Sequence, residues 1–238
     1  MTRVEFLRRI LPTLSTLSLV TACSSVPLPE GGGSVNYSPM LNFTMPVTSM
    51  IGRKFDTVVR QEYDFSCGSA ALATLLRYHY EDPQNEQSVF LGMWRDGDRP
   101  QIRQLGFSLL DMKRYLAGRG IVADGYKVSL AQIGKAQIPG IALINFDGYR
   151  HFVVVKGIDE NTLLLGDPSL GLRRETVQRF ERQWNGVFFI ISGRGAVGRA
   201  HFNMAADANR APEGRIFPGG DRLDLATLAL TRPLPGEF

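Results

Sequence analysis

The stretch Gln61–Leu76, with the sequence QEYDFSCGSAALATLL, places a cysteine directly before a run of small and aliphatic residues. Alanines and leucines at helical spacing predict a helix over Ser69–Tyr80. Cys67 then lies at the start of this helix, where the macrodipole and the free backbone N–H groups stabilise a negative charge on sulfur. Gly68 allows a neighbouring group to approach closely. Cys67 is therefore a candidate nucleophile; the alternative is a small buried hydrophobe, the usual role of a lone cysteine.

A cysteine nucleophile needs a base, and the chain has three histidines. His79 lies about 18 Å from Cys67 along the predicted helix, and His201 lies in a segment of weak periodicity, so we assign both to structure or solvent. His151 opens the predicted strand HFVVVKGI, and Asp167 ends the following one. If these strands pair as a hairpin, the carboxylate lies within reach of the imidazole. The alternatives are a satisfied core histidine at 151 and a turn residue at 167.

The periodicity of the chain changes from helical to strand-like after the first helices. Further helices are expected over 108–118 and 130–137, and strands over 141–146, 151–158, 162–166 and 187–192. Helices followed by a run of antiparallel strands predict an α+β fold.

The segments QEYDFSCGSAALATLL, HFVVVKGID and GDPSLG together resemble the C39 peptidases, the bacteriocin-processing or double-glycine peptidases. This resemblance implies a papain-like fold, with N-terminal helices packed on an antiparallel sheet, and a cysteine peptidase that needs no cofactor. It also implies that Cys67 is the nucleophile, His151 the general base and Asp167 its orienting partner. Gln61 would donate its side-chain N–H to the oxyanion hole, beside the backbone N–H of Cys67; the alternative is a surface polar residue.

The sequence departs from the transporter-linked members of that family in two ways. Ser66 stands where many of them have an acidic residue, and the chain has no transporter module. Cleavage after Gly-Gly is therefore not simply transferred, although a peptide or an exported protein is the expected substrate. Stand-alone, exported relatives occur beside fibre and functional-amyloid secretion systems, which suggests a fibre subunit or a secretion component as partner. Two alternatives stay open: a silent papain-like domain that binds peptide without cutting it, and a structural lipoprotein that serves assembly.

Residues 1–25 are typical of an export signal, with basic residues followed by a short apolar stretch. The stretch ends in Val-Thr-Ala-Cys, which resembles a bacterial lipobox, so we expect Cys23 to carry a lipid and to anchor the chain to the outer membrane from the periplasm. Plain signal cleavage near Ala22 is the alternative. A flexible tether is expected over 26–49, the peptidase domain over 50–195, and an irregular tail over 196–238, with one helix near 223–230.

The formal net charge of +4 does not indicate nucleic-acid binding. Residues 1–22 carry three arginines and one glutamate, so the remaining chain has a net charge of +2. No two histidines have the spacing of metal ligands. The absence of an apolar run of about 18 residues excludes a multi-spanning membrane protein.

Overall fold

The structure is a computed structural model that describes residues 32–38, 41–146 and 148–211. Its strands are β1 (Gly32–Ser38), β2 (Leu41–Thr48), β3 (Ala123–Lys127), β4 (Gly140–Phe146), β5 (Tyr149–Ile158), β6 (Thr162–Asp167), β7 (Gly171–Thr176) and β8 (Trp184–Ile191). Its helices are α1 (Met50–Lys54), α2 (Cys67–His79), α3 (Glu86–Asp96), α4 (Arg99–Leu105), α5 (Leu109–Gly118), α6 (Leu130–Ala136), α7 (Val177–Gln183), α8 (Gly195–Ala200) and α9 (Ala205–Arg210). Within the described residues, no helix is both long and apolar enough to cross a membrane.

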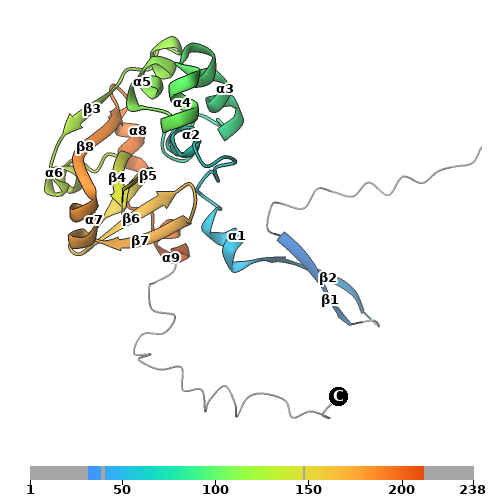
Figure 1. Cartoon of the computed structure of the whole chain (residues 1–238). Helices are drawn as coiled ribbons and strands as arrows, with labels where there is room; N and C mark the ends of the chain where they lie inside the picture. The colour runs from blue at the N-terminus through green and yellow to red at the C-terminus, as the bar shows by residue number, and fades with distance from the viewer. Residues whose placement is uncertain (1–31, 39–40, 147, 212–238) are drawn as a thin grey trace, which may run out of the picture.

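The centre of the fold is a six-stranded antiparallel sheet in the order β3-β8-β4-β5-β6-β7. β5 lies in its interior and is buried on both faces, because alternate side chains point to opposite sides of a strand. Phe152 and Val154 pack in the core that includes α2, α3 and α5. Val153 and Val155 pack in the core that includes α6 and α7. The sheet is thus covered by helices on both faces (Figure 1).

The order of the elements confirms the papain-like α+β arrangement predicted from the sequence. The N-terminal helices α2–α5 gather at one side of the sheet that the later strands form (Figure 1). The helices and strands expected between residues 69 and 192 are all present, with ends that differ by up to two residues except at β8, which begins three residues early. β5 also begins before its expected start at His151, because Tyr149 still pairs with Phe146 of β4.

The segment after residue 195 corrects our expectation of an irregular tail. Up to Ala211 it forms α8 and α9, which have six residues each and are too short to show a clear period. Both are held by contacts with distant parts of the chain. Asp207 of α9 pairs with Lys156 of β5 at 3.0 Å, and Ala211 is buried. The expected helix near 223–230 lies outside the described residues.

The expected tether over 26–49 also differs from the structure where it is described. β1 and β2 pair with each other as an antiparallel two-stranded sheet. Valine, tyrosine, phenylalanine and threonine in these strands favour extended backbone, which outweighs the signal of the neighbouring glycines and prolines. The expected export signal and the candidate lipid site at Cys23 lie outside the described residues.

Candidate active site

Cys67 is the first residue of α2 and a free, buried thiol. The alanines that follow it are fully buried, so α2 lies close to its neighbours in the core. A side chain on Gly68 would meet Met112 and Phe107 at 3.0 Å, which explains the small residue at this position. The sequence therefore fixes the sulfur at the N-terminus of a tightly packed helix.

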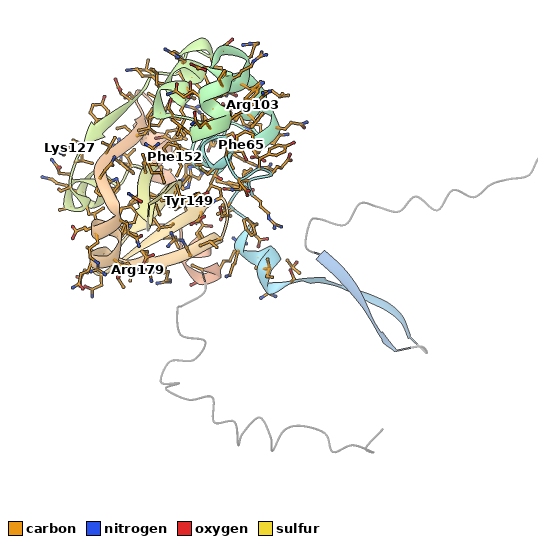
Figure 2. All side chains as sticks on the ribbon, in the orientation of Figure 1. Phe65, Arg103, Lys127, Tyr149, Phe152 and Arg179 are labelled. Carbon is orange, nitrogen blue, oxygen red and sulfur yellow. The ribbon has the colours of Figure 1, made fainter. Side chains whose placement is uncertain are left out.

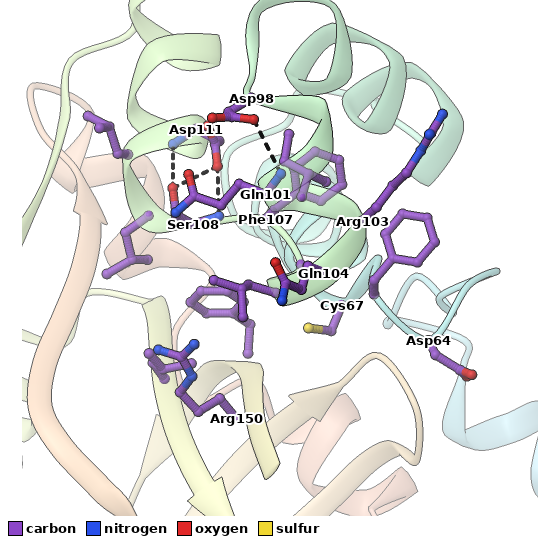
Figure 3. Close-up of a pocket in the computed structure, with 18 of the residues that line it drawn as sticks. Asp64, Cys67, Asp98, Gln101, Arg103, Gln104, Phe107, Ser108, Asp111 and Arg150 are labelled. Carbon is purple, nitrogen blue, oxygen red and sulfur yellow. Dashed lines mark hydrogen bonds between the residues drawn. The ribbon is translucent and has the colours of Figure 1, made fainter. Parts of the chain in front are cut away.

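The Cys67 sulfur points into a cavity of about 740 Å³ (Figure 3). One wall comes from α4, the start of α5 and the segment between them, and the opposite wall comes from the start of β5. Phe65, Tyr149 and Phe152, which are labelled in Figure 2, supply aromatic side chains to the lining of this cavity. Polar side chains, among them Asp64, Gln104 and Arg150, also line the cavity. An open cavity with a mixed lining suits a peptide with both polar and apolar side chains.

His151 and Asp167 form the hydrogen bond that the hairpin arrangement predicted. The Nε2 atom of His151 lies 2.8 Å from Oδ1 of Asp167, and both side chains are buried. β5 and β6 pair antiparallel, with Val154 opposite Gly166, which brings the two polar residues to the same end of the ladder. The pair is therefore a consequence of strand register.

The electrostatics of this pair favour the charged forms of both groups. Burial alone lowers the pKa of His151, but the hydrogen bond to Asp167, the charge of Asp167 and the nearby Cys67 raise it to about 9. Burial alone raises the pKa of Asp167, but His151 and Arg173 outweigh it, and the pKa is lowered. The imidazolium is thus the stable form at neutral pH. The other ring nitrogen, Nδ1, is buried and has no hydrogen-bond partner within the described part of the chain.

Asp167 is held by more than the histidine. Its Oδ1 also accepts hydrogen bonds from the backbone N–H groups of Ser169, at 2.9 Å, and Leu170, at 3.2 Å. Its Oδ2 accepts from Nε of Arg173 at 3.0 Å, and Arg173 also contacts Glu175 at 2.7 Å. Sequence reasoning missed Arg173, because nothing in the pattern of β7 shows which way its side chain turns.

Tyr149 covers the imidazole from the solvent side. Its ring stacks on that of His151, with centroids 5.8 Å apart and planes 24° apart. Its hydroxyl donates to the Asp64 carbonyl at 3.4 Å, so the residue spans from β5 to the loop before Cys67. Tyr149 precedes His151 by two residues, so both side chains point to the same face of the strand. This spacing could have predicted their contact from the sequence.

Gln61 lies on the loop before α2 and contacts the turn that follows β6. Its backbone N–H donates to the Pro168 carbonyl at 3.1 Å. Its side-chain Nε2 donates to the Tyr63 carbonyl at 3.2 Å, and its Oε1 accepts from the hydroxyl of Ser169 at 2.9 Å. The residue is partly exposed. The loop therefore joins the start of α2 to the turn that carries Asp167.

A buried glutamate, also missed by sequence reasoning, holds the middle of this loop. Glu86, at the start of α3, accepts from the backbone N–H of Glu62 at 2.9 Å and from the hydroxyl of Ser66. Ser66 in turn bonds to the backbone of Tyr63. Burial raises the pKa of Glu86 against the opposing effect of these bonds. Ser66, which departs from the acidic residue of the transporter-linked pattern, is thus part of a polar network under the loop.

The two remaining histidines have structural contacts. Nδ1 of His79 donates to the His201 carbonyl at 2.8 Å, and burial lowers the pKa of His79 well below its ordinary value. Nδ1 of His201 donates to the Val197 carbonyl at 3.0 Å. Among the residues that the structure describes, no group of three or more His, Cys, Asp or Glu side chains has the arrangement of a metal site.

Comparison with known proteins places the chain in a family. Residues 56–195 match the Peptidase C39 family. The chain is 39% identical over 187 residues to the "Probable functional amyloid protease FapD" of Pseudomonas aeruginosa, covering 78% of this chain and 80% of that one. It is 42% identical over 149 residues to the FapD of Pseudomonas fluorescens, covering 63% of this chain and 66% of that one. Among solved structures, the peptidase domain of Streptococcus ComA, a bi-functional ABC transporter, matches with a TM-score of 0.48 and 21% identity, covering 57% of this chain and 96% of that domain. The matched segment includes the candidate nucleophile, the His–Asp pair and Gln61, and the chain belongs to the peptidase C39 family.

Proposed function

We propose that this protein is a cysteine endopeptidase in which Cys67, His151 and Asp167 act together. The observation that carries the proposal is the buried hydrogen bond of 2.8 Å between Nε2 of His151 and Asp167. The second ring nitrogen of His151, Nδ1, has no hydrogen-bond partner within the described residues. Cys67 contributes to the raised pKa of this imidazole and lies at the adjacent cavity. Nucleophile, base and orienting group together form the set that catalyses acyl transfer through a covalent intermediate in triad enzymes.

In this mechanism, the Cys67 thiolate attacks the carbonyl carbon of the scissile peptide bond while His151 is protonated. The developing oxyanion accepts hydrogen bonds from the backbone N–H of Cys67 and from Nε2 of Gln61. The imidazolium then gives its proton to the leaving amine, and the C–N bond breaks. A water molecule, deprotonated by His151, releases the acyl group from sulfur. Asp167 holds the ring in place and stabilises the imidazolium.

We further propose that the substrate is an exported protein. The relatives of this chain in Pseudomonas carry the name "Probable functional amyloid protease FapD". This name favours a fibre subunit, or a component of the system that secretes the fibre, as the substrate. Cleavage after a Gly-Gly pair is the specificity to test first. We place the protein in the periplasm, attached to the outer membrane through a lipid on Cys23, since the lipobox-like sequence precedes that residue.

The test compares secreted proteins from cells that carry the wild-type chain or the Cys67→Ala variant, with new N-termini read by mass spectrometry. We expect at least one N-terminus to disappear in Cys67→Ala and in His151→Gln. His201→Gln is the matched control, because that ring lies outside the cavity, and it should leave the cleavage intact. An unchanged set of N-termini in Cys67→Ala would show that the protein is not the peptidase. Labelling with a radioactive fatty acid, lost in Cys23→Ser, tests the anchor.

A further inference from the structure

The turn that follows β6 contacts both parts of the proposed catalytic machinery. On one side, the backbone N–H groups of Ser169 and Leu170 donate to the Asp167 carboxylate. On the other side, the Pro168 carbonyl accepts from the backbone of Gln61, and the Ser169 hydroxyl donates to Oε1 of Gln61. Four consecutive residues thus link the partner of the base to the oxyanion donor, although Gln61 and Ser169 are 108 positions apart in sequence.

The orientation of the Gln61 amide decides whether it can stabilise an oxyanion. A glutamine side chain has a donor end and an acceptor end, and only the NH₂ end is useful here. The Tyr63 carbonyl can only accept, so it requires the NH₂ end of Gln61 on its side at 3.2 Å. Oε1 therefore faces Ser169, whose hydroxyl must donate. Nε2 has a second hydrogen, and among the described residues none accepts it.

We propose that Ser169 is a positioning residue that orients the Gln61 amide as an oxyanion donor; this inference rests on the proposed function. Without the hydroxyl, Oε1 loses its partner in the turn, and the partly exposed amide rotates toward solvent. The link to Asp167 is unaffected, because it uses the backbone N–H of residue 169, which any non-proline residue supplies. Replacing the side chain therefore isolates the effect on Gln61 from the effect on Asp167.

The test uses p-nitrophenyl acetate, because the natural substrate is not needed to form an oxyanion. The Cys67 sulfur bonds to the acetyl carbon, p-nitrophenolate leaves, and water then hydrolyses the thioester. Alkylation by iodoacetamide serves as the control reaction, since displacement of iodide at a methylene carbon forms no oxyanion. Both rates are measured on the wild type, Ser169→Ala, Ser169→Thr, Gln61→Ala and the Gln61→Ala/Ser169→Ala double variant, and the release of p-nitrophenolate is also measured on Cys67→Ala.

We expect Ser169→Ala to slow acylation about threefold to tenfold, the range for one solvent-accessible hydrogen bond, and to leave alkylation unchanged. Ser169→Thr keeps the hydroxyl and should restore the rate to within about twofold. In the Gln61→Ala background, the loss of Ser169 should have no further effect. The proposal is overturned if Ser169→Ala acylates at the wild-type rate, if it slows alkylation equally, or if its effect is the same with and without Gln61. Failure of the proposed function is recognised separately, because Cys67→Ala would then release p-nitrophenolate as fast as the wild type.

Discussion

Replacing Asp207 with alanine is expected to destabilise the fold by about 3–5 kcal/mol, because it leaves a buried lysine without its partner. The Nζ atom of Lys156 lies 3.0 Å from Oδ2 of Asp207 and 2.8 Å from the Thr57 carbonyl, and the lysine is 1% exposed. The other carboxylate oxygen of Asp207 accepts from the Thr57 hydroxyl at 2.7 Å. This network joins α9 to β5 and to the segment between α1 and α2.

The pH dependence of the loss gives a sharper test than its size. Burial lowers the pKa of Lys156, and Asp207 opposes that effect. In Asp207→Ala the ammonium group of Lys156 can lose its proton instead of staying buried as a cation. From an ordinary pKa of 10.5 this costs about 5 kcal/mol at pH 7 and about 2 kcal/mol at pH 9. The destabilisation caused by the unpaired lysine therefore cannot exceed the free energy of deprotonating it, and this maximum falls as the pH rises.

The assay is urea denaturation of wild type and variants at pH 7 and pH 9, followed by tryptophan fluorescence. The matched control is Lys156→Met/Asp207→Ala, which removes both charges and keeps the volume of the lysine stem; we expect it to recover most of the loss. A loss below about 1 kcal/mol in Asp207→Ala at pH 7, or a double variant as unstable as the single one, would refute the reasoning.

The remaining predictions concern the site and its supports. Activity should fall as the pH rises through about 9, where the His151 imidazolium is lost; a pH profile of kcat/KM with an alkaline limb near 6.5 would contradict this. By the same shift, His151 stabilises the fold below pH 6.5, and this stabilisation is lost as the pH rises through about 9. Arg173→Met should move the alkaline limb to higher pH, because Asp167 keeps its backbone donors but no longer shares its charge between Arg173 and the His151 imidazolium. Arg173→Lys keeps the positive charge and should leave the limb at the same pH. Glu86→Gln should lower the free energy of unfolding by about 1–3 kcal/mol, since an amide nitrogen cannot accept from the loop. Because the pKa of Glu86 is raised in the fold, its own contribution to stability declines as the pH rises through that pKa, and this dependence should be absent from thermal melts of Glu86→Gln.

The parts of the fold that the sequence predicted are those that rely on local pattern. The apolar runs of β4, β5 and β6 and the alanine-rich α2 are buried on most sides, so their composition alone indicates what they are. The His151–Asp167 contact followed from hairpin geometry, because adjacent antiparallel strands have few possible registers.

The parts that the sequence did not predict depend on partners far along the chain. β7 is an edge strand with the sequence GLRRET, which lacks the alternation of a half-buried strand. Its Arg173 contacts Asp167 of β6 and Glu175 of β7 itself. Glu86 is an ordinary first-turn glutamate of α3 until the loop before Cys67 folds onto it. Such contacts follow from tertiary packing and leave no periodic signal.

The two halves of the proposed site differ in what keeps them in place. The His151–Asp167 pair is buried and lies on adjacent strands of one sheet, so its geometry is as stable as the sheet itself. Gln61 lies on a partly exposed loop, and its position depends on hydrogen bonds to the turn after β6. Hydrogen bonds that water can reach are weaker holds than strand pairing, because water competes for the same donors and acceptors. The oxyanion donor is therefore the part of the machinery most open to adjustment by a bound substrate. Asp64 and Phe65 of the same loop line the cavity, so a peptide bound there would contact the loop that carries Gln61.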